Sequence, residues 1–201
     1  MLLSEEVLIN SIKNVCVFAS AADDIDEIFY EDAANLGHLI GANGYNIVYG
    51  GSHKGLMYAC ANAVDKSGGK IFAVMPQKMV DAGLANPQDC EEFHITMGMR
   101  ERKAKLDEIS DAVIAVAGGI GTLEEITEMM VQKQLGYSNK PTVILNTNGF
   151  YDNFIEFLYT MEKYRFTHGK ISDVVYFANT PEDAINYIRN YVPQKVYSRL
   201  D

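Results

Sequence analysis

Short apolar segments, typical of strands buried on both faces, alternate with longer amphipathic segments along the chain. The apolar segments cover residues 13–20, 45–51, 70–76, 111–119, 140–146 and 173–179, with 91–96 as a weaker candidate. The amphipathic segments repeat apolar residues at spacings of three and four, which predicts helices. They cover residues 24–42, 55–69, 99–109, 122–136, 151–163 and 180–192. This alternation predicts an α/β fold in three layers, with a mostly parallel sheet and helices on both of its faces.

The chain is expected to form one domain, residues 1–201. No internal repeat, low-complexity tract or linker interrupts the alternation of strands and helices. The composition is 48% hydrophobic and 22% charged, which is ordinary for a globular protein, and the length suffices for a full core. Thr180 followed by Pro181 is typical of a helix start and marks the beginning of the last helix.

Charge and cysteine content narrow the class of protein. The formal net charge of −10 argues against a nucleic acid polymer as partner, although one small anion still fits a locally positive pocket. Cys16, Cys60 and Cys90 form no CxxC pair, so we expect neither disulfides nor a zinc site, and a cytoplasmic location. Residues 1–10 lack the basic start of a signal peptide, and no apolar run reaches the ~18 residues of a membrane span.

A glycine-rich loop joins the apolar segment 111–117 to the helix that follows it. Gly118, Gly119 and Gly121 let the backbone turn sharply and approach a ligand closely. The next helix begins with free N–H groups and the positive end of its dipole, which together can hold a phosphate. The sequence G-G-x-G-T is neither a Walker loop nor G-x-G-x-x-G, so we do not expect ATP hydrolysis of the Walker type.

Thr122 and Glu125 allow a purely structural interpretation. Their spacing, T-x-x-E, is that of a capping box, in which the glutamate would accept the backbone N–H of the threonine. A carboxylate beside a phosphate site is also repelled by the negative charge of the phosphate. This cost raises the second interpretation, in which Glu125 acts on a group of the substrate. Both interpretations stay open at this point.

The ends of two other predicted strands belong to the same candidate site. In parallel sheets ligands bind beyond the carboxyl ends of the strands, which directs attention to the loops after Ser20, Gly50 and Ala117. Gly50 and Gly51 end the second strand, and this turn either lines the pocket or simply joins a strand to a helix. Ser20 ends the first strand and is a candidate contact to a nucleotide.

A cluster of basic residues precedes the glycine loop in the sequence. Arg100, Arg102, Lys103 and Lys105 fall within six residues of a chain that is acidic overall. They form either a solvated helix face, with pairing of Glu101 to Lys105, or a site for an oxyanion. An arginine near the loop suits the second role, because its planar guanidinium binds oxyanions through two donors.

Taken together, these motifs resemble the LOG ("Lonely Guy") family. "MRERK" and "GGIGTLEE" are similar to its paired signatures M-H-x-R-K and P-G-G-x-G-T-x-x-E, and "YGGSHKGLM" is similar to its G-G-G-x-x-G-L-M turn. The resemblance covers most of the chain. It implies a Rossmann-like fold and a homodimer. It also implies hydrolysis of the N-glycosidic bond of a nucleoside 5′-monophosphate, AMP or an N6-modified AMP, with no metal or organic cofactor.

The resemblance also assigns residues. It implies that Arg102 and Glu125 are catalytic. The same comparison places Met99 and Lys103 in the first signature, and we expect both to bind substrate. The remaining expected substrate contacts are Ser20, Gly50, Gly51, Gly118, Gly119, Gly121 and Thr122.

The chain departs from the family pattern at a few positions. Ala117, Arg100 and Ser52 replace a proline, a histidine and a glycine, which leaves the contacts to the base and the sugar open. An alternative function is that of a carrier with the same fold, which binds a nucleotide or a molybdenum cofactor without cleaving it. The intact Arg102 and Glu125 favour an enzyme. Amino-acid decarboxylation is disfavoured, because no lysine stands in a recognisable pyridoxal-binding motif.

Overall fold

The computed structural model describes residues 12–193, which build one parallel sheet. Its seven strands lie in the order β4-β3-β2-β1-β5-β6-β7, and all six neighbouring pairs are parallel. The strands are β1 (Asn14–Phe18), β2 (Asn46–Tyr49), β3 (Ile71–Pro76), β4 (Glu92–Thr96), β5 (Ala112–Ala115), β6 (Thr142–Leu145) and β7 (Tyr176–Ala178). The absence of a signal peptide was inferred from residues 1–10, which lie outside the described residues.

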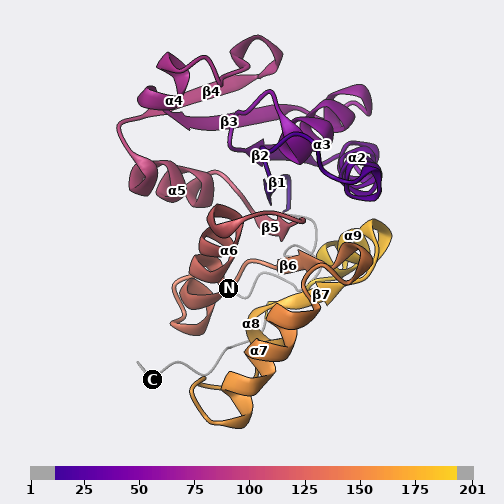
Figure 1. The fold of residues 1–201 in the computed structure, drawn as a ribbon, viewed down its shortest axis with the longest axis vertical. Coiled ribbons are helices and arrows are strands. Elements are labelled where there is room, and N and C mark those ends of the chain that lie inside the picture. Colours follow the sequence, from indigo (N-terminus) through magenta and orange to yellow (C-terminus); the bar gives the residue numbers. More distant parts are fainter. Residues whose placement is uncertain (1–11, 194–201) are drawn as a thin grey trace, which may run out of the picture.

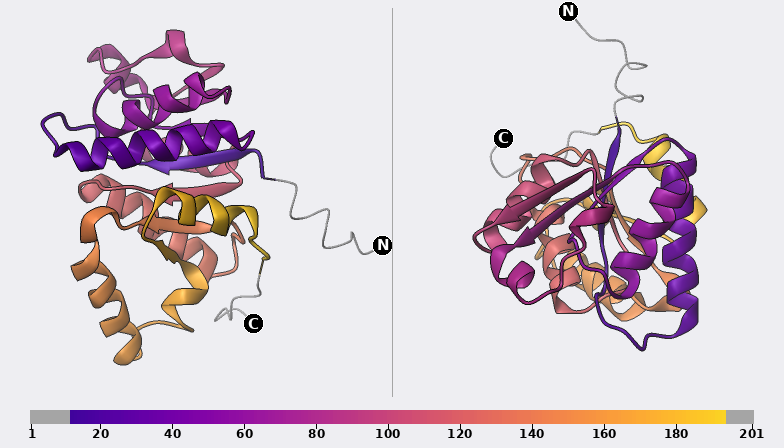
Figure 2. Two further views of the ribbon diagram at one scale, coloured as in Figure 1. Left: turned by 90° about the vertical axis from the view of Figure 1, so that its right-hand side faces the viewer. Right: turned by 90° about the horizontal axis from the view of Figure 1, so that it is seen from above.

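Helices cover both faces of the sheet (Figures 1 and 2). They are α2 (Glu27–Ala42), α3 (Gly55–Lys66), α4 (Gln77–Asp81), α5 (Met99–Glu108), α6 (Ile120–Gln134), α7 (Asp152–Lys163), α8 (Ile171–Val174) and α9 (Pro181–Arg189). Two 3₁₀ turns, Pro87–Asp89 and Thr147–Gly149, complete the structure. Helices α2, α3 and α9 pack on one face, whereas α5, α6, α7 and α8 pack on the other. The predicted three-layer α/β architecture is therefore confirmed.

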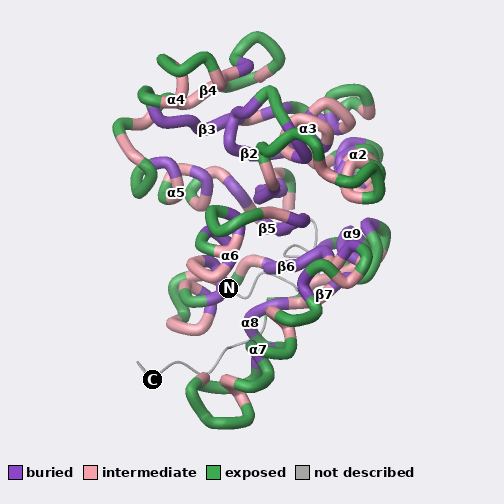
Figure 3. Tube along the Cα trace, viewed as in Figure 1, coloured by how far each residue is buried: buried purple, intermediate pink, exposed green. Residues whose placement is uncertain are grey.

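The core consists of two apolar clusters, one on each side of the sheet. Alternate strand residues supply them: Val15 and Val17 face α2, α3 and α9, whereas Cys16 and Phe18 face α6. Strands β5 and β6 are buried along their whole length, as the burial colouring of Figure 3 shows. Burial on both faces explains why the strand segments of the sequence are apolar throughout rather than alternating.

Most predicted elements are confirmed with shorter ends, and one is partly wrong. The segment 173–179 was expected to be a strand, but its first residues belong to α8, and β7 begins only at Tyr176. The Asp173 carboxylate accepts the backbone N–H of Lys170 at 3.0 Å and so holds the turn that starts α8. At the last helix the expectation is confirmed: the Thr180 hydroxyl accepts the N–H of Asp183, and Pro181 is the first residue of α9.

No helix between residues 12 and 193 combines the length and the apolar character needed to cross a bilayer.

Candidate active site

A cavity opens where the strand order changes direction. Strands β1 and β5 are neighbours, but the chain leaves β1 toward β2 and β5 toward β6, so their loops diverge. Such a switch point is where parallel α/β sheets bind ligands. The cavity here has a volume of about 300 Å³. It is lined by Ala19, Ser20, Ala21, Met57, Met79, Met99, Arg102, Gly119, Gly121, Thr122 and Glu125.

The glycine loop forms one wall of this cavity. A Cβ at Gly118 would lie 2.1 Å from the Thr122 hydroxyl oxygen, so only glycine fits there. At Gly119 and Gly121 an added Cβ would meet nothing within 4 Å, because these positions face open space. Helix α6 starts directly after Gly119, and no side chain caps its first turn. The wall therefore presents free backbone N–H groups and the positive end of a helix dipole.

The capping-box interpretation of Thr122 and Glu125 is not borne out, because neither residue caps α6. Thr122 is the third residue of α6, and the capping position is Gly119. The helix starts two residues before the predicted position 122, which carries Glu125 past the first turn. Its carboxylate instead accepts a hydrogen bond from Nη1 of Arg102.

Arg102 and Glu125 form a buried ion pair in the lining of the cavity. Their relative exposures are 5% and 4%. Arg102 belongs to α5, and its Nε donates to the carbonyl oxygen of Val74 in β3 at 3.2 Å. The guanidinium also lies against Gly50, where a Cβ would come within 2.3 Å of Nη2. Val74 in β3, Gly50 after β2 and Glu125 in α6 thus surround the guanidinium of Arg102. The guanidinium in turn holds the carboxylate of Glu125 in place.

Burial perturbs the ionisation of this pair. It raises the pKa of the Glu125 carboxyl above its usual range, because the charged form loses hydration. The positive charge of Arg102 and its hydrogen bond oppose the shift. A carboxyl that is buried, shifted and turned into a cleft is a candidate catalytic group.

Comparisons with known proteins give the family of this chain. A protein family described as "Possible lysine decarboxylase" matches residues 57–188. The rice (Oryza sativa subsp. japonica) "Probable cytokinin riboside 5′-monophosphate phosphoribohydrolase LOGL2" is 31% identical over 196 residues, which are 96% of this chain and 80% of the relative. The chain belongs to the LOG family.

Two further comparisons bear on sequence and fold. The "Cytokinin riboside 5′-monophosphate phosphoribohydrolase" of Rhodococcoides fascians is 36% identical over 146 residues, covering 73% of this chain and 74% of the relative. A molybdenum cofactor carrier protein of Chlamydomonas reinhardtii superimposes with a TM-score of 0.66 at 21% identity, covering 89% of this chain and 96% of the other. The carrier shares the fold.

Within the LOG signatures the structure separates residues that face the cavity from residues that support it. Ser20, Met99, Arg102, Gly119, Gly121, Thr122 and Glu125 line the cavity, as a substrate site requires. Gly50 lies against the guanidinium of Arg102, Gly51 faces the Phe93 ring, and Gly118 faces Thr122. These three glycines permit close packing, and a direct contact to substrate stays a prediction.

Lys103 points away from the LOG cavity. Its ammonium pairs with Glu124 and Glu128 of α6, and it lines a different cavity, of about 470 Å³, between α5 and α6. Consecutive helix residues point about 100° apart, so Arg102 and Lys103 cannot both face the loop. The expected role of Lys103 in substrate binding has no support in this arrangement.

Sequence reasoning found Met99 but missed other apolar residues of the lining, among them Met57 and Met79. Met57 belongs to the LOG turn motif and follows Gly55, so the motif could have pointed to it. Met79 lies on the short helix α4, within a segment that carries no periodic signal. Ala117, Arg100 and Ser52, where the chain departs from the LOG pattern, do not line this cavity.

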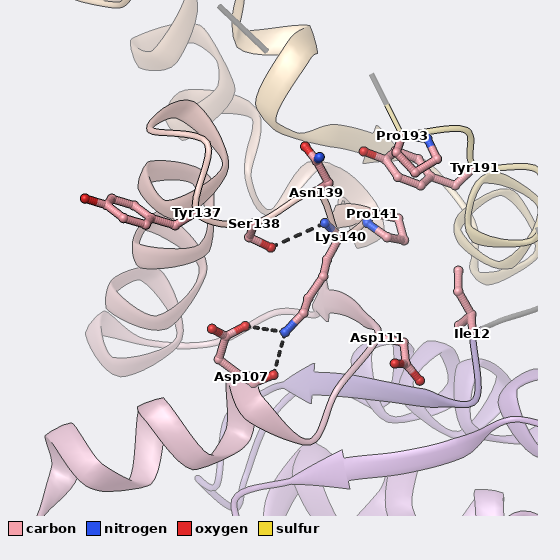
Figure 4. A pocket seen from close by; sticks show the side chains of 10 residues that line it. All are labelled: Ile12, Asp107, Asp111, Tyr137, Ser138, Asn139, Lys140, Pro141, Tyr191 and Pro193. Atoms are coloured by element: carbon pink, nitrogen blue, oxygen red, sulfur yellow. Dashed lines mark hydrogen bonds and ion pairs between the residues drawn. The ribbon is translucent and has the colours of Figure 1, made fainter. Parts of the chain in front are cut away.

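A third cavity, of about 330 Å³, lies at the amino ends of β1, β5 and β6 (Figure 4). Its lysine, Lys140, is already neutralised: the ammonium contacts the carboxylate and the backbone carbonyl of Asp107. Asp111 likewise accepts the backbone N–H groups of Lys13 and Asn14, each at 2.9 Å. The charged groups of this cavity therefore hold neighbouring parts of the chain together.

No cluster of histidine, cysteine or carboxylate side chains suited to a metal occurs within residues 12–193.

Proposed function

We propose that the protein hydrolyses the N-glycosidic bond of a nucleoside 5′-monophosphate, AMP or an N6-modified AMP, and releases the free base and ribose 5-phosphate. The observation that carries the proposal is the buried Arg102–Glu125 pair, which faces a cavity beside an uncapped helix N-terminus. The names of the rice and Rhodococcoides relatives support the same reaction.

The 5′-phosphate is proposed to bind at the start of α6. The N–H groups near Gly119 and Gly121 are open to the cavity, and Thr122 adds a hydroxyl. Binding there orients the ribose toward Glu125, which lies one helical turn further along α6. The phosphate therefore contributes orientation as well as affinity.

Glu125 is proposed to act on the sugar. Cleavage of a glycosidic bond builds positive charge on the ribose ring. An ionised carboxylate beside the anomeric carbon stabilises that charge or accepts a proton from the attacking water. Water adds to the anomeric carbon, and the bonding electrons and one proton leave with the base. Arg102 holds the carboxylate in its ionised form and in position.

A carrier function is the second candidate, because a molybdenum cofactor carrier shares the fold. A carrier that binds an anion has no need of a carboxylate beside its phosphate site, because the two would repel each other. The Arg102–Glu125 pair facing the cavity therefore favours hydrolysis.

We also propose that the chain acts as a single nucleotide-binding domain and forms a homodimer in the cytoplasm. Val131, Tyr137 and Phe157 are at least half exposed on and beside α6 and α7, and such apolar surface favours a subunit contact. The three cysteines are unpaired, and two of them are buried, which fits a reducing compartment. The net charge of −10 disfavours a nucleic acid polymer as partner.

The direct test is incubation with a panel of nucleoside 5′-monophosphates and chromatographic detection of the released base. Glu125→Gln should retain nucleotide binding and lose most turnover. Glu124→Gln is the matched control, because its carboxylate is exposed and pairs with Lys103 outside the cavity. If the wild-type protein binds nucleotides without releasing base, the carrier function replaces hydrolysis.

A further inference from the structure

Lys133 is a buried lysine that forms no ion pair with any carboxylate of residues 12–193. It lies in the last turn of α6 and is 3% exposed. Among the ion pairs of residues 12–193 none involves Lys133, whereas Lys103 and Lys140 each contact a carboxylate. The neighbour of its ammonium is the ring of Tyr191, with 4.7 Å between Nζ and the ring centroid. Buried charges are normally paired, so an ammonium with no carboxylate partner among the described residues is a candidate to bind an anion.

A cavity of about 390 Å³ adjoins this ammonium. It is lined by Lys133, Ser172, Asp173, Tyr187, Asn190, Tyr191 and Val192. The walls combine aromatic rings with the hydroxyl of Ser172 and the amide of Asn190. Tyr187 is held in place because its ring stacks on Tyr176, with the centroids 4.1 Å apart and the planes at 4°.

The positive charge of Lys133 determines the electrostatic potential inside the cavity. Asp173 is the acidic residue of the lining, but it is exposed, and one of its oxygens already accepts the N–H of Lys170. Water and salt screen an exposed carboxylate far more than a buried ammonium. Burial lowers the pKa of Lys133 to about 8, and Asp173 opposes this shift. At pH 7 most of the lysine is therefore protonated, and no carboxylate of residues 12–193 forms an ion pair with it.

We propose that this cavity is a binding site for a small organic carboxylate, whose anionic group pairs with Lys133 and whose apolar body packs against Tyr187 and Tyr191. The site is separate from the candidate active site. Lys133 lies eight residues beyond Glu125 on α6, a distance of about 12 Å at 1.5 Å per residue. The proposal does not depend on the proposed hydrolysis.

Benzoate is the probe, because it carries a carboxylate on an aromatic body, and benzyl alcohol is its neutral counterpart. Titration calorimetry on the full chain at pH 7 should show benzoate binding that Lys133→Met weakens about tenfold or more, the effect of losing one charge-assisted hydrogen bond. Lys163→Met is the matched control: its ammonium also lies over a tyrosine ring, that of Tyr164, but is exposed. This variant should bind benzoate as the wild type does.

A pH series on the wild type tests the proposal without any variant. Only the ammonium form attracts a carboxylate, so benzoate affinity should fall as pH rises through about 8, approaching tenfold per unit above it. The other groups that face Lys133 are Asp173, Tyr187 and Tyr191. Burial raises the pKa of Tyr187 and raises that of Tyr191 to about 12, so neither tyrosine produces a loss of affinity near pH 8.

Three results would overturn the carboxylate site. The first is the absence of benzoate binding to the wild type at millimolar concentrations. The second is equal benzoate affinity for the wild type and Lys133→Met, or equal affinity of the wild type for benzoate and benzyl alcohol. The third is an affinity that stays constant between pH 7 and pH 9.5.

Discussion

Gly50→Ala tests whether the position of Arg102 controls turnover. The added Cβ would lie 2.3 Å from Nη2 of Arg102, whereas ordinary contact begins at 3.4 Å. The guanidinium must therefore move by about 1.1 Å, the difference between the two distances. It cannot do so while keeping its bonds to both Val74 and Glu125. Misplacement of a catalytic group by about 1 Å costs on the order of 100-fold in rate, so kcat for base release from AMP should fall by about that factor.

The same substitution should cost about 1–3 kcal/mol of stability, as overpacking of a buried site usually does. Adenine release at saturating AMP gives kcat, and urea unfolding gives the stability. Gly98→Ala is the matched control, because a Cβ there meets nothing within 4 Å and the φ of −156° suits any residue. A folded Gly50→Ala protein with the kcat of the wild type would refute the positioning role of Arg102.

Three further predictions follow from the site and the fold. Turnover needs the ionised form of Glu125, whose pKa is raised. The acid limb of the pH profile of kcat/KM should therefore lie above the pH range of an ordinary glutamate, and a profile that is flat down to pH 4 would contradict this. Lys103→Met should leave kcat/KM for AMP unchanged, since the ammonium lies outside the cavity of the candidate active site. A large increase in KM would show that Lys103 binds substrate after all. Thr180→Ala should lower the free energy of unfolding by about 1 kcal/mol through loss of the cap on Asp183, measured by urea titration, and no change would show that the cap is dispensable.

The sequence was sufficient to predict the layers of the fold, because each buried strand carries a continuous apolar run and each helix an amphipathic stripe. The first residues of segment 173–179 were assigned wrongly for the same reason, whereas the strand itself, β7, is present. The valines of this segment are buried whether the backbone is helical or extended. The hydrogen bonds that make the turn helical, from the N–H of Asp173 to the carbonyl of Lys170 and from the N–H of Val175 to the carbonyl of Ile171, leave no mark in the pattern of apolar residues. The start of α6 was placed too late, because glycine disfavours helices, yet Gly121 lies inside the first turn.

The site was partly predictable, since the carboxyl ends of neighbouring parallel strands meet at one edge. That rule predicts from the sequence alone that Ser20 and the glycine loop lie together, and both line the cavity. The direction of a side chain on a helix could not be obtained in this way. Arg102 turns inward to Val74 and Lys103 turns toward Glu128, a difference that depends on how α5 packs against β3 and α6. Met79 reaches the cavity from a segment whose sequence shows no periodicity.

The most direct measurement is the crystal structure of the Glu125→Gln variant with AMP bound. In that structure the phosphate should contact the backbone N–H groups of residues 119–122. The anomeric carbon should lie beside the side chain of residue 125. A phosphate bound elsewhere, or a ribose turned away from residue 125, would contradict the proposed mechanism.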